Sequence, residues 1–92
     1  MSLNNLGLAI KAKKVVFGTE FVIEAVRRNK VCLVLVANDA SEKTLKKVLD
    51  KCQFYQVAVS KKFSSLEFAK ILNGKNVKVI GITDQGFKKL VE

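Results

Sequence analysis

Five carboxylates are the side chains that could supply acid–base chemistry to this chain: Glu20, Glu24, Asp39, Glu42 and Asp84. The chain has no histidine, which is the commonest general base near neutral pH. Most of the five stand where helices are expected to begin, and a carboxylate there caps the helix or complements its dipole. We therefore predict a protein that is not an enzyme and that needs no cofactor.

Signatures of nucleotide and metal binding are weak. Gly74-Lys75 lacks the upstream glycine and the following Ser or Thr of a phosphate-binding loop. Cys32 and Cys52 do not have the spacing of a zinc site. We expect both cysteines to be reduced, buried and apolar in their role, and we predict neither a disulfide nor a metal site.

The sequence has more residues that are suited to binding an anionic partner. Gly18-Thr19-Glu20 is expected to end a short strand and open a helix, where backbone N–H groups can receive phosphate or base oxygens. The chain carries 17 Lys and Arg against 8 Asp and Glu, giving a net charge of +9 and a pI near 9.8. Such a basic domain favours polyanionic partners, first nucleic acid and then an acidic membrane surface. Excess lysine that serves only solubility is the alternative.

The lysines that could hold a nucleic-acid backbone lie in or beside expected loops: Lys13, Lys14, Lys61, Lys62 and Lys75. In a small sandwich these loops are expected to lie along one end of the sheet. Phe21 and Phe63 are the aromatic residues expected nearest that end, whereas most of the aromatic side chains are expected in the core.

The elements that must position these residues are organised around residues 31–37, seven apolar residues without a polar break. A run of this kind is typical of a strand covered on both faces. The other expected strands are 15–17, 56–59, which is also expected to be covered, and 77–82. Helices precede, separate and follow the strands. This alternation predicts helices on both faces of one small, mostly parallel or mixed sheet.

Helix-start signals support this order. Thr19 is the expected N-cap of the second helix, and either Asp39 or Ser41 that of the third. Ser64 and Glu67 have the spacing of a capping box that opens the fourth helix.

The length of 92 residues predicts a single domain over residues 1–92. No apolar run approaches the roughly 20 residues needed to span a bilayer, and residues 1–5 do not begin a signal peptide. We expect a cytoplasmic monomer that makes no membrane contact.

Five phrases, in order and spacing, resemble the ribosomal L7Ae/L30e-like family of kink-turn RNA-binding proteins, most closely its short bacterial, YlxQ-type branch. They lie at residues 6–9, 16–20, 33–41, 51–52 and 79–87. The resemblance implies an α/β fold, a three-layer α-β-α sandwich with a small four-stranded mixed sheet. It also implies a non-enzymatic protein that binds structured, kink-turn-like RNA and is associated with a ribosome or another ribonucleoprotein.

In that family a Gly-x-Asn-Glu-x-x-Lys motif at the start of the second helix reads sheared G·A pairs. Alignment through Gly18 and Ala25 puts Glu20 at the Asn position, Phe21 at the Glu position and Glu24 at the Lys position. Phe21 cannot accept a hydrogen bond, and Glu24 reverses a charge that should face phosphate. An alignment shifted by one residue would put Glu20 at the family's Glu but would misplace Ala25.

The family's second contact is the loop after the fourth helix, where an apolar residue meets an extruded base. Leu72 and Lys75 are the equivalents that the resemblance implies here. The expected RNA-binding residues are therefore Gly18, Thr19, Glu20, Phe21, Glu24, Leu72 and the five loop lysines. The alternative is a protein-interaction or assembly module that keeps the fold but has lost kink-turn specificity.

Overall fold

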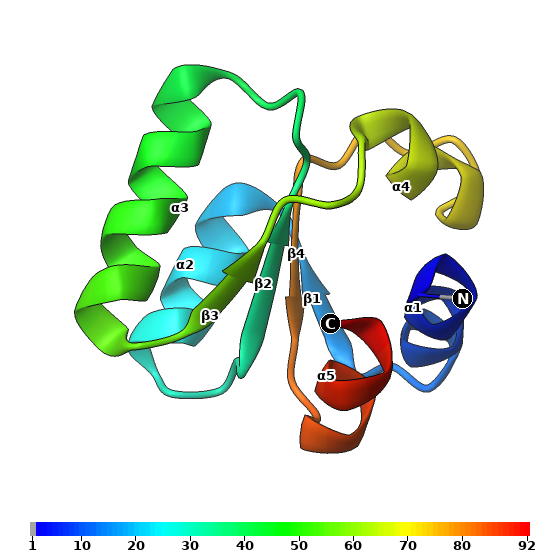
Figure 1. Cartoon of the computed structure of the whole chain (residues 1–92), viewed down its shortest axis with the longest axis horizontal. Coiled ribbons are helices and arrows are strands. Elements are labelled where there is room, and N and C mark those ends of the chain that lie inside the picture. Colours follow the sequence, from blue (N-terminus) through cyan, green and yellow to red (C-terminus); the bar gives the residue numbers. More distant parts are fainter. Residues whose placement is uncertain (1) are drawn as a thin grey trace.

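Helices and strands alternate along the whole computed structural model, which describes residues 2–92, with side chains from residue 3 (Figure 1). The elements are α1 (Ser2–Lys11), β1 (Val15–Phe17), α2 (Thr19–Arg27), β2 (Leu33–Val36), α3 (Glu42–Tyr55), β3 (Ala58–Ser60), α4 (Ser65–Ile71), β4 (Val79–Ile82) and α5 (Gln85–Val91). The predicted order of elements is confirmed.

The four strands form one mixed sheet in the order β1-β4-β2-β3. The last strand, β4, lies inside the sheet and runs antiparallel to both β1 and β2, whereas β2 and β3 are parallel. Val15 of β1 therefore pairs with Ile82 of β4, across almost the whole length of the chain. The expectation of a four-stranded mixed sheet is confirmed.

The predicted central strand is shorter than residues 31–37, but every residue of β2 is buried, as a strand covered on both faces requires. Its side chains alternate between two cores. Leu33 and Leu35 face one, and Val34 and Val36 face the other. The backbone N–H of Ala37 donates to the Lys78 carbonyl at 2.7 Å, so the pairing extends beyond the strand.

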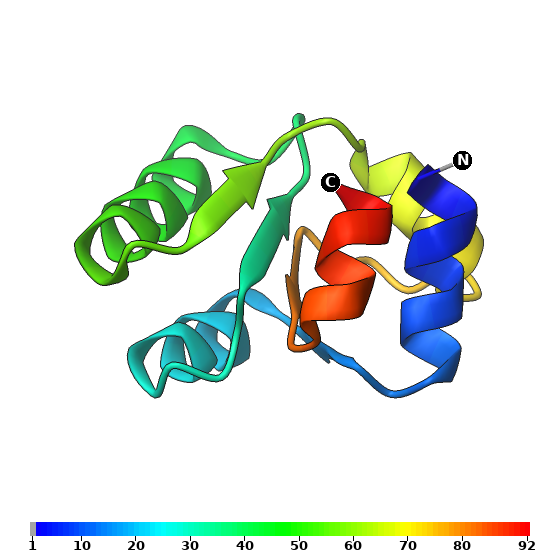
Figure 2. The same cartoon turned by 60° about the horizontal axis from the view of Figure 1, so that its bottom comes forward.

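Helices cover both faces of the sheet. On one side α2 and α3 pack over Val34 and Val36, and on the other α1, α4 and α5 enclose Leu33 and Leu35 (Figure 1). Figure 2 shows α1 and α5 side by side, and there the Asn5 side-chain amide donates to the Leu90 carbonyl at 3.0 Å. The predicted three-layer α-β-α sandwich is therefore confirmed. Within residues 2–92, no helix has the length and apolar character to cross a membrane.

A glycine inside β4 brings α2 close to the sheet. A Cβ added at Gly81 would lie 3.1 Å from Val31 Cγ2 and 3.4 Å from Val22 Cγ1. These distances are tighter than ordinary contacts, so a larger residue would push α2 or the segment before β2 outward. The glycine thus helps to determine where α2, which carries the expected RNA-binding motif, lies over the sheet.

The prediction of a second covered strand at residues 56–59 is wrong in place and in burial. β3 is an edge strand, and Ala58 is exposed. Gln56 instead ends α3 in the left-handed conformation, with φ of 58°. A short apolar run does not by itself distinguish a central strand from an edge strand, because that depends on which strands pair.

Helix caps and cysteines follow the sequence in most respects. Ser41, rather than Asp39, is the N-cap of α3, and its side chain accepts from the Thr44 N–H at 3.2 Å. The capping box of Ser64 and Glu67 is present at α4. Cys52 is buried, as expected, whereas Cys32 is only half-buried. Burial raises the pKa of the Cys52 thiol to about 11.

Candidate nucleic-acid interface

Most of the expected binding residues lie at one end of the sheet, where strands begin or end. Because β1, β2 and β3 run in one direction and β4 in the other, the ends of the first three strands meet the start of β4. This edge, at the top of Figure 1, is called the upper edge. Backbone bonds join its segments: the Gly18 N–H donates to the Val79 carbonyl at 3.0 Å and the Asn38 N–H to the Phe63 carbonyl at 2.9 Å.

The N-terminus of α2 lies at this edge and has no side-chain cap. Gly18, not Thr19 as expected, is the N-cap, and its φ of 94° is a conformation that favours glycine. The helices α3, α4 and α5, by contrast, are capped by the side chains of Ser41, Ser64 and Asp84. The first N–H groups of α2 therefore stand at a positive helix end without a capping side chain.

Phe21 projects from the first turn of α2 and is 74% exposed. A Cβ built on Gly18 would lie 3.6 Å from Cδ2 of Phe21, so the ring lies beside the backbone of the N-cap. The sequence placed Phe21 near the loop end of the sheet, and this is confirmed. Phe63 also lies at the upper edge, but it is 5% exposed and belongs to the core.

The two glutamates of α2 are both held by cations of the same molecule. Glu20 accepts from the ammonium of Lys47 on α3. Glu24 accepts from Arg28 Nε at 2.8 Å and from Arg27 Nη1 at 3.3 Å. The hydrogen bond from Arg28 and the charges of both arginines hold the pKa of Glu24 below its usual range. Glu24 is thus a bridge between two guanidinium groups, and the two glutamates together have three cationic partners.

The loop after α4 also lies at the upper edge, but Leu72 does not face outward. Leu72 is 7% exposed and packs in the core, so it cannot meet a base without leaving that core. Its expected role is therefore incompatible with its position. The exposed part of the loop is Asn73–Asn76, where Asn73 and Gly74 have φ of 56° and 84°. Lys75 is exposed in this loop, and Lys78 follows it just before β4.

The five loop lysines were expected to lie along one end of the sheet, but they lie at two opposite ends. Lys61 and Lys62 follow β3 at the upper edge, where the Lys62 ammonium donates to the Glu92 carbonyl at 2.7 Å and lies 5.5 Å from the Phe63 ring centroid. Lys13 and Lys14 precede β1 and lie at the opposite end of the strands, which is called the lower edge. There the Thr83 N–H donates to the Lys14 carbonyl at 2.9 Å.

Three of the five carboxylates considered for catalysis are bound to different partners. Asp39 accepts from both the backbone N–H and the hydroxyl of Ser65 at the start of α4, and these bonds lower its pKa. Glu20 and Glu24 are bound to cations of α3 and α2. Among residues 2–92 no three His, Cys, Asp or Glu side chains are grouped as metal ligands.

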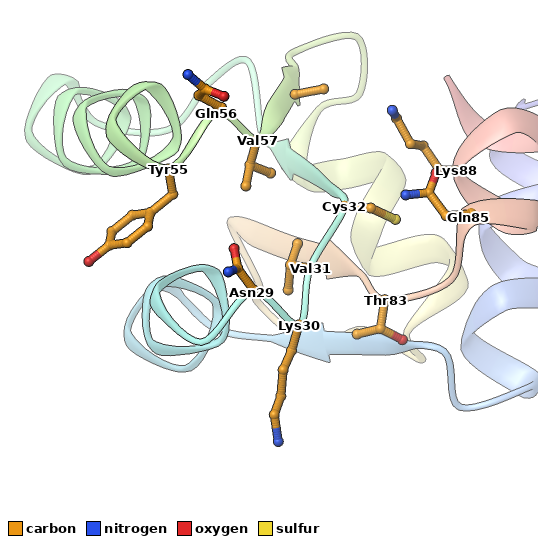
Figure 3. A pocket seen from close by; sticks show the side chains of 11 residues that line it. Asn29, Lys30, Val31, Cys32, Tyr55, Gln56, Val57, Thr83, Gln85 and Lys88 are labelled. Atoms are coloured by element: carbon orange, nitrogen blue, oxygen red, sulfur yellow. The ribbon is translucent and has the colours of Figure 1, made fainter.

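A pocket of about 430 Å³ lies at the lower edge, away from the N-terminus of α2 (Figure 3). Its lining includes Lys30, Cys32, Tyr55, Thr83 and Lys88. The C-terminal ends of α2 and α3 and the N-terminus of α5 border this pocket. The pocket is therefore separate from the upper edge.

Sequence reasoning missed several cations of the upper edge and of α2. Lys47 is 27 residues from its partner Glu20, and no local pattern joins the two. Arg27 and Arg28 could be assigned only to the end of α2, because their bonds to Glu24 depend on side-chain conformation. Lys78 lay inside the predicted strand 77–82, so it was not grouped with the lysines of the predicted loops.

Curated relatives share most of this sequence. The chain is 46% identical over 88 residues to "RNA-binding protein YlxQ" of Enterococcus faecium, covering 96% of this chain and 84% of the relative. It is 43% identical over 82 residues to the protein of that name from Bacillus subtilis (strain 168), covering 89% of this chain and 82% of the relative.

Solved structures share the fold. A protein described as of unknown function from Bacillus halodurans C superposes with a TM-score of 0.91 at 38% identity, over 97% of this chain and 91% of the other. The Giardia lamblia 15.5kD RNA binding protein superposes with a TM-score of 0.77 at 21% identity, over 97% of this chain and 77% of that one. Residues 2–92 match the family described as ribosomal protein L7Ae/L30e/S12e/Gadd45. Family match, sequence relatives and fold agree: the chain belongs to the ribosomal protein L7Ae/L30e/S12e/Gadd45 family.

Proposed function

We propose that this protein binds structured RNA with a kink-turn-like bend, through the upper edge of its sheet, as a cytoplasmic component of a ribosomal or other ribonucleoprotein particle. The names of its two bacterial relatives support RNA as the partner. The net charge of +9 supports a polyanion.

The observation that carries the proposal is the N-terminus of α2. Gly18 supplies no capping side chain, so the N–H groups of the first turn are available to oxygens of a ligand. Helix N-termini attract phosphate because the N–H groups and the helix dipole act together. An RNA phosphate or base oxygen is the ligand that fits both the charge and the geometry.

Cations around this terminus would hold the rest of the RNA backbone. Lys78 precedes Val79, whose carbonyl accepts from the Gly18 N–H, and Lys75 lies in the loop before it. Lys47 is bound to Glu20 in the first turn of α2. Arg27 and Arg28 offset the charge of Glu24 on the same helix. The departure of Glu24 from the family's lysine is therefore less repulsive to phosphate than the aligned residue alone indicates.

Fluorescence anisotropy with two labelled RNAs tests the proposal, one with a kink-turn and one a paired duplex of equal length. We expect tighter binding to the kink-turn, with log Kd rising by about 0.7–0.9 per phosphate contact for each tenfold increase in salt. A matched pair of double variants places the site. Lys75→Ala with Lys78→Ala should weaken binding, whereas Lys13→Ala with Lys14→Ala, an equal charge change at the lower edge, should have little effect.

Two results would contradict the proposal. If neither RNA binds at about 50 mM salt, where phosphate contacts are strongest, RNA is not the partner. A protein partner that copurifies after nuclease treatment would then support the assembly-module alternative. If both double variants weaken binding equally, the attraction is a general effect of charge and the upper edge is not the interface.

A further inference from the structure

Phe21 is exposed in a way that the fold does not require. Its side chain is 74% exposed, whereas the buried residues of the same helix are Val22, Ile23, Ala25 and Val26. Among residues 2–92, no ring–ring or cation–π contact involves Phe21. An exposed phenyl ring stabilises the isolated molecule little, and because single exposed apolar residues are common, its role must be judged from what surrounds it.

A second exposed aromatic residue shows what is distinctive about Phe21. Phe54 is 77% exposed near the end of α3, but its ring packs edge-on against Tyr55 with centroids 4.9 Å apart. Phe21 instead lies beside the backbone of Gly18, at the helix terminus that has no side-chain cap. The ring and the first N–H groups of α2 therefore form one continuous surface.

The surroundings of the ring favour a nucleic-acid base over an apolar protein segment. Glu20, its neighbour in the sequence, is bound to Lys47, and Lys75 and Lys78 lie at the same edge. An unpaired base offers a flat face to an aromatic ring, and its phosphate is complementary to nearby cations and helix N–H groups. A phenyl ring has no hydrogen-bonding group, so it can stack on a base without reading the base's edge.

We propose that Phe21 is a stacking platform for one unpaired base of the RNA, with the adjacent phosphate facing the N–H groups of Thr19 and Glu20. The inference rests on the proposed function and adds to it a class of target, namely RNA with an unpaired nucleotide next to its structured part. Stacking tolerates all four bases, so this contact contributes affinity rather than sequence specificity.

The experiment uses a kink-turn RNA in which each unpaired nucleotide in turn is replaced by 2-aminopurine, whose fluorescence is quenched when it stacks. We expect the wild-type protein to quench one position further, and Phe21→Leu to lose that quenching. Base–aromatic stacking corresponds to an affinity loss of roughly 5- to 100-fold for Phe21→Leu. Phe21→Trp should keep both properties, and Phe54→Leu, on a ring equally exposed, should change neither.

The outcomes separate the inference from the proposed function. If wild-type protein binds the RNA but Phe21→Leu binds equally tightly, stacking is refuted and RNA binding stands. If Phe54→Leu weakens binding as much as Phe21→Leu, the loss is not specific to this surface, and stacking is again refuted. If wild-type protein binds no RNA, the proposed function falls, and the stacking contact falls with it. Unchanged circular dichroism of Phe21→Leu would show that the fold is kept.

Discussion

Exchanging Glu24 for lysine tests whether the face of α2 beyond its first turn meets RNA phosphate. Glu24 bridges Arg28 Nε at 2.8 Å and Arg27 Nη1 at 3.3 Å. The variant therefore adds one cation and releases two guanidinium groups from their partner. The lysine also restores the charge that the family's motif has at this position.

The magnitude follows from the number of contacts. One or two new phosphate contacts should steepen the slope of log Kd against log salt by about 0.7–1.8. We expect RNA to bind at least about tenfold more tightly at low salt, which corresponds to about 1.4 kcal/mol. The lost ion pairs should cost little stability, because the three side chains are 47–65% exposed. Exposed ion pairs between neighbouring turns of a helix contribute little, because water and salt screen them.

Fluorescence anisotropy at several salt concentrations measures both quantities, and Asp50→Lys is the matched control. Asp50 is also an exposed carboxylate paired with a cation on its own helix, Lys46 at 3.5 Å. The two variants therefore change the net charge equally, but Asp50 lies in the second half of α3, which leads away from the upper edge. If both variants strengthen binding equally, or if Glu24→Lys leaves the affinity unchanged, this face of α2 does not meet phosphate.

Two further predictions concern stability and reactivity. Gly18→Ala should lower the melting temperature by roughly 5–20 °C in a calorimetric scan, because φ of 94° strains any other residue. Gly7→Ala, in the middle of α1 with open space around it, should raise it by a few degrees, and a similar fall in both variants would contradict this reasoning. Iodoacetamide should modify the half-buried Cys32 before Cys52, whose pKa is raised to about 11. Mass spectrometry of labelled peptides measures the order, and faster modification of Cys52 in folded protein would refute it.

The sequence was most informative about features that depend on residues close together in the chain. The unbroken apolar run of residues 31–37 predicted a strand buried on both faces, and β2 is such a strand. The spacing of Ser64 and Glu67 predicted a capping box, which is present. These features depend on near neighbours in the chain, so a local pattern is enough to identify them.

The sequence was less informative where the answer depends on strand order. Lys13 and Lys14 were grouped with the other loop lysines, but β1 runs parallel to β2, so the loop before it lies at the lower edge. The apolar residues around β3 gave no sign that it would be an edge strand. Leu72 was expected at the surface of a loop, whereas it completes the core below α4. Each of these results required the three-dimensional arrangement of elements distant in sequence.

The place of β4 between β1 and β2 has a consequence for how the protein acquires its structure during synthesis. β1 is made early, but its neighbour in the sheet is β4, and Val15 must wait for Ile82 to be translated. Until then β1 has no strand to pair with, whereas β2 and β3 can already associate. The nascent chain therefore exposes unpaired strand edges until β4 is available, and final closure depends on pairing residues far apart in sequence, which slows folding. Truncation before β4 should leave a β2–β3 unit with α3 rather than a smaller version of the fold.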